Sequence, residues 1–182
     1  MMRIPRNLRA LWANDDAAAA AEMALVVPLL VILMFGSFEL GRYFLDEHVV
    51  VKAVRDGARY ASRQGSADYS CTGPTASASG AAVTRTQNIV RFGKPVVTDS
   101  DVPRLRYWGA TSDGQPSVRV TVSCPAALIG TETLTGIYAG KTNVPVVEVE
   151  AVVEYDSLFG LFGFGGGVLD VTAESRSAVM GI

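Results

Sequence analysis

The chain contains a 16-residue apolar run, Met23–Phe38, that is entered through alanines and a single carboxylate, Glu22. Counted from Ala17, the apolar stretch is 22 residues long. At about 1.5 Å per residue, a helix of this length measures roughly 33 Å, which is close to the hydrocarbon thickness of a bilayer. The segment therefore predicts a transmembrane helix. A carboxylate at its entrance is costly unless a partner or water offsets the charge, so Glu22 needs an explanation.

Three interpretations of this segment are open. Arg3, Arg6 and Arg9 precede the run, as in a secretory signal, but no A-x-A cleavage site follows it. A plain single-pass anchor is the second interpretation. The third, which we favour, is an anchor that is processed before its apolar segment. Basic residues are nearly balanced on the two sides of the run, so the positive-inside rule orients it only moderately.

A helical rhythm continues beyond the apolar run. Apolar residues recur at spacings near three, four or seven, and the opposite-charge pairs Arg42–Asp46 and Lys52–Asp56 lie four residues apart. These patterns predict one continuous helix from Ala18 to about Arg63, stopped by Gly65 with Ser66. Its first half is apolar all round. Its second half is amphipathic, so we expect that half to pack on the C-terminal domain.

Pro28 lies inside the apolar half of this helix. Proline removes a backbone hydrogen bond, so we expect a helix kink or a local loosening at this position. Two readings stay open. Pro28 is either a proline that the membrane tolerates or a flexible point that helps the helix leave the bilayer.

Cys71 and Cys124 are the only cysteines, and both lie downstream of the long helix. Such a pair suits a disulfide in an oxidising compartment. Closing a loop of about 53 residues stabilises a fold by roughly 4 kcal/mol in the chain-entropy model. The alternative is two unrelated buried thiols. Zinc-binding spacings are absent, because the chain has no C-x-x-C motif and one histidine, His48.

The residues after the long helix predict an antiparallel sheet with one solvated face. Gly65–Gly80 reads as a polar loop or linker and Gly80–Phe92 as a short helix. Polar and apolar residues then alternate along three segments, with a fourth, weaker candidate; the four are Ser117–Cys124, Val144–Tyr155, the C-terminal stretch around Leu169–Glu174, and Val102–Trp108. The amphipathic half of the long helix would cover the other face, which gives an α+β fold.

The chain offers no residue set for catalysis. His48 has no acid–nucleophile pattern around it, and G-x-S-x-G, H-E-x-x-H and phosphate-loop motifs are absent. Glu148, Glu150 and Glu154 share one strand face, which is better read as solvated than as cation-binding. Sixteen basic and eighteen acidic residues, with no basic block after the leader, disfavour a nucleic-acid binder. We therefore expect no enzyme activity, no metal and no cofactor.

Leu158–Gly167 carries large apolar residues between glycines in what should be a connection. It reads either as a loop that faces a partner or membrane, or as a flap over the sheet core.

The segment Ala17–Arg59 resembles the TadE-like family, the minor pilins (pseudopilins) of the tight-adherence, or Flp, pilus system. The resemblance rests on Glu22-Met23-Ala24-Leu25, Pro28, Gly41-Arg42 and Arg55-Asp56-Gly57-Ala58-Arg59. It covers about a quarter of the chain. Two positions depart from the family pattern. Ala17 stands where the family has glycine, and Met23 replaces an aromatic residue.

The resemblance implies an assembly role. A prepilin peptidase would cut between Ala17 and Ala18, so that Glu22 becomes the fifth mature residue and neutralises the new amino terminus of a neighbouring subunit. Two opposite charges buried together cost far less than one alone. The alternative is that Glu22 reaches water at headgroup level. Implied partners are other pilin and minor pilin subunits, the prepilin peptidase, the inner-membrane assembly platform and the lipid bilayer.

These inferences define three expected parts. Residues 1–17 are a cleaved basic leader, residues 18–64 are the long helix with its transmembrane half at 18–38, and residues 65–182 form a periplasmic or extracellular α+β domain. The protein is expected in the inner membrane with this domain in the periplasm, or incorporated into a pilus outside the cell. The alternative function is an uncleaved, membrane-anchored periplasmic adaptor or binding domain.

Overall fold

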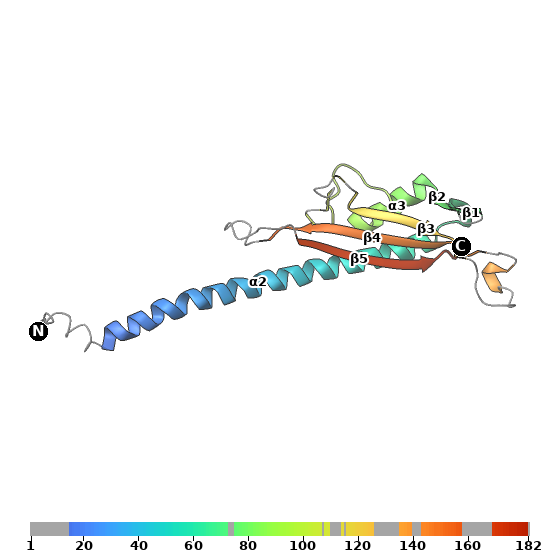
Figure 1. Cartoon of the computed structure of the whole chain (residues 1–182). Coiled ribbons are helices and arrows are strands. Elements are labelled where there is room, and N and C mark those ends of the chain that lie inside the picture. Colours follow the sequence, from blue (N-terminus) through green and yellow to red (C-terminus); the bar gives the residue numbers. More distant parts are fainter. Residues whose placement is uncertain are drawn as a thin grey trace, which may run out of the picture. The chain divides into compact units, whose positions relative to one another are not determined.

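The computed structural model describes residues 15–72, 75–106, 108–109, 114, 116–125, 135–139, 143–157 and 169–181 (Figure 1). The chain divides into two compact units, Met1–Arg42 and Tyr43–Ile182. The apolar segment Leu158–Gly167 and the leader residues 1–14 lie outside the described residues.

The long helix α2 runs from Asp15 to Ser62, close to the predicted range. It begins at the acidic pair Asp15–Asp16, where negative charge is favourable at a helix N-terminus. Its last turn ends in short-range bonds, in which the Arg63 amide donates to Tyr60 O at 3.2 Å and Ser62 Oγ donates to Arg59 O at 2.9 Å. The helix therefore stops just before the predicted Gly65–Ser66 pair.

The described residues of the segment predicted to be a polar loop or linker, Gly65–Gly80, form regular elements, so that prediction is wrong for them. They form the 3-10 turn η1 (Ser66–Asp68) and a two-stranded antiparallel hairpin of β1 (Tyr69–Thr72) and β2 (Thr75–Ala78). Small polar composition hid the hairpin, because its stability comes from long-range contacts of Tyr69 and Cys71 rather than from strand propensity.

Helix α3 (Gly80–Phe92) has the predicted bounds. Ser79 caps it, since its Oγ accepts a hydrogen bond from the Ala82 amide at 3.2 Å. Gly93 ends it at φ 80°, the left-handed conformation in which glycine has no steric penalty. Ala82, Thr86 and Val90 form its buried side.

The main sheet has three antiparallel strands in the order β3–β4–β5. These are β3 (Val118–Ser123), β4 (Val146–Tyr155) and β5 (Leu169–Ala178), and all three coincide with predicted alternating segments. The register pairs Val118 with Ala151 and Ala151 with Ala173. A second 3-10 turn, η2 (Gly136–Tyr138), lies between β3 and β4 in the chain.

The fourth candidate strand, Val102–Trp108, is wrong for the described residues 102–106 and 108, which contain no strand. Pro103 interrupts the stretch, and the Arg104 amide donates to Arg91 O at 2.7 Å, at the end of α3. The stretch is an irregular connection whose apolar residue Trp108 is buried in the core at 1% exposure. Val102 is 81% exposed, so the apolar residues of the stretch do not share the one-sided burial of a strand.

One face of the main sheet joins the second half of α2 in a common core. Every second residue of β4 is buried, and each such valine contributes roughly 1.5–3 kcal/mol when it leaves water. The buried residues that α2 and β4 contribute to this cluster are Val50, Ala53, Val54, Ala58, Ala61, Val147, Val149, Ala151, Val153 and Tyr155. The predicted α+β fold, with an amphipathic helix packed on an antiparallel sheet, is confirmed.

Candidate functional site

The first half of α2 exposes its apolar side chains. From Ala18 to Phe35 every residue is exposed, including Leu25 at 79% and Ile32 at 63%. In the described part of the chain, α2 is the one helix long and apolar enough to cross a membrane, with a mean hydropathy of 2.4 in its most apolar window. Apolar surface on this scale needs a bilayer or the apolar helices of other proteins around it. The segment is thus consistent with a membrane anchor.

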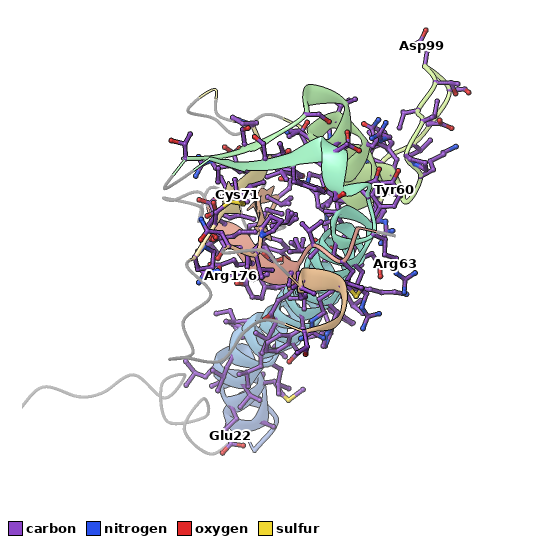
Figure 2. All side chains as sticks on the ribbon, turned by 90° about the vertical axis from the view of Figure 1, so that its right-hand side faces the viewer. Glu22, Tyr60, Arg63, Cys71, Asp99 and Arg176 are labelled. Carbon is purple, nitrogen blue, oxygen red and sulfur yellow. A yellow bond between two sulfur atoms is a disulfide. The ribbon has the colours of Figure 1, made fainter. Side chains whose placement is uncertain are left out.

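Glu22 lies near the N-terminal end of α2, as Figure 2 shows, and is exposed. Ala17 and Ala18, the predicted cleavage positions, are helical residues just before it. A carboxylate in the second turn of the helix has the position and reach to accept a cation from another molecule. Its pairing with a neighbouring amino terminus stays a prediction, as does the cut between Ala17 and Ala18.

Pro28 is an interior residue of α2, which continues on both sides of it. Because proline has no N–H, the Ala24 carbonyl lacks its usual helical donor. Farther along, Ser37 Oγ donates to Leu33 O at 2.8 Å. This bond within the helix satisfies the hydroxyl, so Ser37 needs no partner from another element. The kink at Pro28 stays a prediction.

The second half of α2 carries the Arg55–Arg59 motif at its contact with α3 and the sheet. A Cβ added at Gly57 would overlap Val90 Cγ2 and would lie 3.6 Å from Val149 Cγ1. Ala58, the next residue, is also buried. The two small residues therefore let α2 approach α3 and β4 closely, a role that the sequence motif alone did not reveal.

Asp56 of the same motif is held by a distant arginine. Arg104 Nη1 donates to Asp56 Oδ2 at 3.3 Å, and both side chains are partly exposed. The predicted partner, Lys52, makes no such ion pair among the described residues. The longer guanidinium reaches Asp56 from the connection after α3, and its backbone is already fixed there by the bond to Arg91 O.

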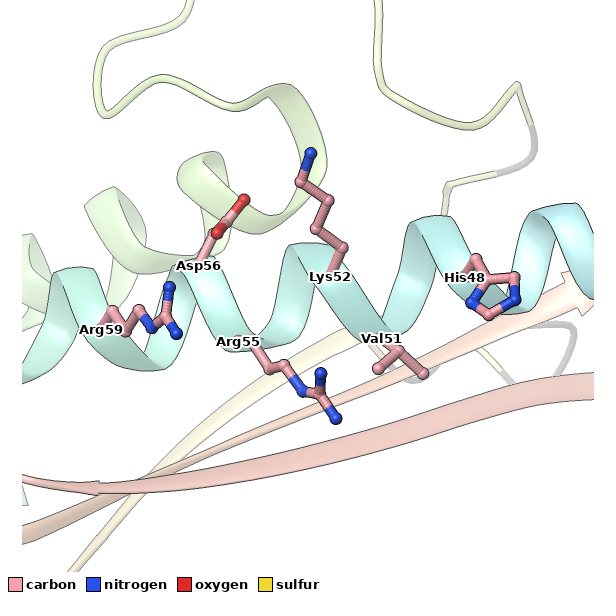
Figure 3. A pocket seen from close by; sticks show the side chains of 6 residues that line it. All are labelled: His48, Val51, Lys52, Arg55, Asp56 and Arg59. Carbon is pink, nitrogen blue, oxygen red and sulfur yellow. The ribbon is translucent and has the colours of Figure 1, made fainter.

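His48, Val51, Lys52, Arg55, Asp56 and Arg59 line an open hollow of about 390 Å³ on the outer side of α2 (Figure 3). His48 is exposed, as predicted for a surface histidine. Lys52, Arg55 and Arg59 give the hollow a positive character. These six residues include no serine, threonine or cysteine, and three of them are cations, so the arrangement suits binding of an anionic group.

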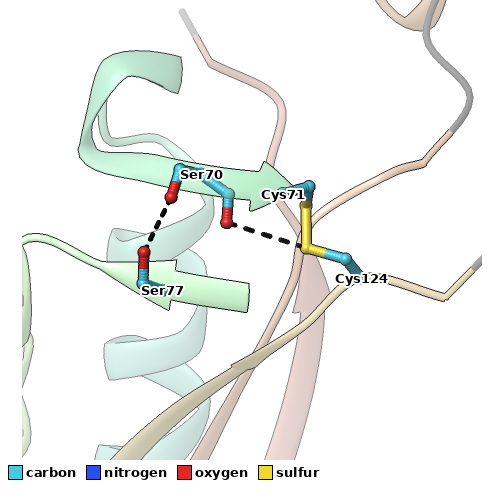
Figure 4. Close-up of a disulfide and its surroundings, with 4 residues drawn as sticks. All are labelled: Ser70, Cys71, Ser77 and Cys124. Carbon is cyan, nitrogen blue, oxygen red and sulfur yellow. Dashed lines mark hydrogen bonds between the residues drawn. A yellow bond between two sulfur atoms is a disulfide. The ribbon is translucent and has the colours of Figure 1, made fainter. Parts of the chain in front are cut away.

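Cys71 and Cys124 form the predicted disulfide, with their Cα atoms 5.8 Å apart (Figure 4). The bridge ties β1 to the residue that follows β3. Ser70 and Ser77 hydroxyls are 2.7 Å apart across the hairpin. Cys124 Sγ also lies 3.9 Å from Ser70 O, which is a van der Waals contact because a disulfide sulfur carries no hydrogen.

Tyr69 fastens the same hairpin to α2. Its hydroxyl donates to Ala61 O at 2.8 Å, and the side chain is 7% exposed. Burial, with a smaller contribution from the Asp68 carboxylate, raises the pKa of Tyr69 to about 12. The phenol therefore stays protonated as a donor throughout the physiological pH range.

The carboxylates on β4 form ion pairs on a solvated face. Glu148 accepts from Arg176 Nε at 3.1 Å, and Glu150 accepts from Arg119 Nη1 at 3.2 Å. Across the described ranges, no group of three or more His, Cys, Asp or Glu side chains could hold a metal ion.

Taken together, these features define a class: a protein with one exposed, membrane-length apolar helix whose continuation packs on a small disulfide-linked α+β domain. The family model described as TadE-like protein matches residues 17–59. The predicted resemblance is confirmed over this segment, which implicates the chain in assembly of a tight-adherence pilus. No curated protein and no solved structure matches the chain.

Proposed function

We propose that this chain is a minor pilin (pseudopilin) that acts without catalysis in the biogenesis of a tight-adherence, or Flp, pilus. Residues 1–17 are removed by a prepilin peptidase between Ala17 and Ala18. The mature chain sits in the inner membrane with its α+β domain in the periplasm, and it enters the pilus or its base through the apolar half of α2.

One observation carries this proposal. The matched segment, 17–59, contains two helix stretches with different surroundings: apolar residues exposed up to Phe35, then residues buried in the domain core from Val50 onward. The second stretch holds the domain together. The first has no apolar cover within the described residues, so its function requires other molecules.

Glu22 has a specific role in this proposal. The cut before Ala18 creates a free amino terminus four residues from Glu22 in sequence. In a helix-to-helix assembly, the carboxylate of one subunit neutralises the ammonium group of the next, so that neither charge is buried alone. Glu22 therefore selects a correctly processed neighbour.

Replacing Glu22 by Ala tests this role. We expect the variant to insert in membranes at wild-type levels, because losing a charge favours insertion, and to lose most pilus assembly in cells that make the pilus. Glu47→Ala is the matched control, since Glu47 lies on the same helix outside the apolar run. Normal piliation by Glu22→Ala would contradict the charge-pairing role.

A second function is an uncleaved periplasmic adaptor, which Ala17 favours because it stands in place of the glycine typical before the cut. In that case residues 1–17 remain attached and Glu22 meets headgroups or water. The two functions differ in the first residue of the protein recovered from membranes.

A further inference from the structure

A row of cations runs along the outer face of the second half of α2. We call Lys52, Arg55, Arg59 and Arg63 the basic stripe; the first three lie in α2 and Arg63 directly follows it, and all four are exposed. At 100° per residue, they lie opposite the buried residues Val50, Val54 and Ala61. The stripe therefore faces away from the sheet.

The basic stripe is electrostatically unsatisfied. Among the described residues, none of its four side chains makes an ion pair. The carboxylate beside it, Asp56, is engaged by Arg104. The stripe also borders the open hollow of about 390 Å³, so there is room between its side chains for groups from another molecule (Figure 3).

The opposite side of the same unit is acidic. We call the solvated side of β4 and β5 the acidic face; its carboxylates are Glu148, Glu150, Glu154, Asp170 and Glu174. The register sets Glu150 directly opposite Glu174, and Glu154 directly opposite Asp170. Like charges directly opposite on neighbouring strands are destabilising. Arg119 pairs with Glu150, and Arg176 pairs with both Glu148 and Glu174. The face therefore holds five carboxylates and two guanidinium groups, which leaves it net negative.

The two surfaces belong to one compact unit and point in opposite directions. In the end-on view of Figure 2, Arg63 projects on one side of the unit and Arg176 on the other. They also match in length. Lys52 to Arg63 extends about 17 Å along a helix, and Glu148 to Glu154 extends about 20 Å along a strand.

We propose that the basic stripe of one copy of this chain docks on the acidic face of a second copy. The inference rests on the proposed function, because it names a contact by which such a subunit would join others. The acidic face stays net negative after its own two arginines are counted, and the basic stripe carries four positive charges, so the two surfaces attract each other.

This contact is heterologous, since it joins two different surfaces of identical chains. Each bound copy still presents a free stripe at one end and a free acidic face at the other, so further copies can add. Exposed ion pairs contribute little individually and are screened by salt. The contact is therefore weak in solution, and confinement of the chains in a membrane strengthens it.

Cross-linking the full chain in phosphatidylcholine vesicles tests the proposal. His48→Cys places a thiol beside the stripe, and Thr172→Cys places one on the acidic face, while the native disulfide stays closed. A short bismaleimide cannot reach from one face of a unit to the other. We expect the variant with both thiols to give a ladder of dimers, trimers and larger species, and each single-thiol variant to give no ladder beyond a dimer.

Charge reversal supplies the decisive comparison. Arg55→Glu with Arg59→Glu cancels the net charge of the basic stripe, because two cations and two carboxylates then lie on it. Glu154→Lys with Asp170→Lys changes the net charge of the acidic face from negative to positive. Each reversed chain alone should lose cross-linking on the order of tenfold, whereas an equal mixture of the two should regain it. Arg55→Gln with Arg59→Gln, which adds no repulsion, should show a smaller loss. A retained Cys71–Cys124 bridge and an unchanged melting temperature report that each variant is folded.

A ladder that is insensitive to reversal, or a mixture that fails to recover it, overturns the proposal. A ladder that requires phosphatidylglycerol overturns it as well, because headgroups would then be what the stripe binds. The Glu22→Ala experiment is independent. If Glu22→Ala leaves piliation intact while the ladder still forms, the charge-pairing role fails and the contact stands. If Glu22→Ala abolishes piliation while no ladder forms, the charge-pairing role stands and only the contact is rejected.

Discussion

Gly57 of α2 lies against Val90 of α3 so closely that the space for a Cβ atom is already filled by Val90 Cγ2. Glycine inside a helix costs about 1 kcal/mol relative to alanine. Close packing offsets this cost, because the absence of a side chain at Gly57 lets α2, α3 and β4 share one core. The contact connects the TadE-like segment directly to the domain that it carries.

Gly57→Ala should destabilise the domain by about 1–3 kcal/mol, because an added methyl group in a packed core forces side chains or backbone to shift. The gain in helix propensity offsets part of this cost. Chemical unfolding of the full chain in detergent measures the change. Gly41→Ala is the control; it is also helical, but nothing lies within 4 Å of its added Cβ, so it should be neutral or stabilising.

A second substitution isolates the contact itself. Val90→Ala removes the methyl groups that Gly57→Ala would meet, so the double variant should be more stable than the sum of the single effects by about 1 kcal/mol. Strictly additive effects would mean that Gly57 is not held against Val90.

Asp56→Asn should lower stability by about 0.5–1 kcal/mol, since it weakens a partly exposed ion pair with Arg104. Raising the salt concentration should shrink the difference between wild type and variant. Lys52→Gln, which removes a charge next to Asp56 on the same helix, should leave the melting temperature unchanged. An equal loss of stability in both variants would indicate that Asp56 pairs with Lys52 rather than with Arg104.

Reduction of Cys71–Cys124 should destabilise the domain by roughly 4 kcal/mol, the chain-entropy value for a closed loop of about 53 residues. Unfolding curves with and without dithiothreitol measure it. The double variant Cys71→Ser, Cys124→Ser should have this lower stability both with and without dithiothreitol. A wild-type protein that is indifferent to the reductant would argue against the bridge.

Stability should fall as the pH rises from about 10 to 12, through the titration of Tyr69. Its pKa is about 12 in the folded protein and about 10 when unfolded. Below pH 10 the phenol is protonated in both states, so the full stabilisation is present. Between the two values the unfolded state loses its proton first and is favoured. Tyr69→Phe should be less stable at pH 8 and should lose less stability above pH 10 than wild type.

Most regular elements could be predicted because their patterns are local. The alternation of Val147, Val149 and Val153 with glutamates identified β4, and the spacing of Ala82, Thr86 and Val90 identified α3. Tertiary contacts explain the errors. The β1–β2 hairpin depends on Tyr69 reaching Ala61 and on Cys71 reaching Cys124, and neither contact leaves a periodic signal in residues 65–80.

The candidate site was predictable in part. Glu22 and the apolar run were visible as sequence, and the Asp56–Gly57–Ala58 motif was recognised by resemblance. The partners of that motif, Val90 and Arg104, were not found, because they lie 33 and 48 residues away and carry no motif of their own. Packing partners of this kind become visible only when the fold brings them together.

The most direct test of the central claim is to identify the N-terminal residue of the protein in its native membranes. Intact mass spectrometry of the chain purified from membranes and from sheared pili reads it without a substitution. A minor pilin should give one species that begins at Ala18. A mass that includes Met1 or Met2 in both fractions would contradict the account and favour an uncleaved membrane-anchored adaptor.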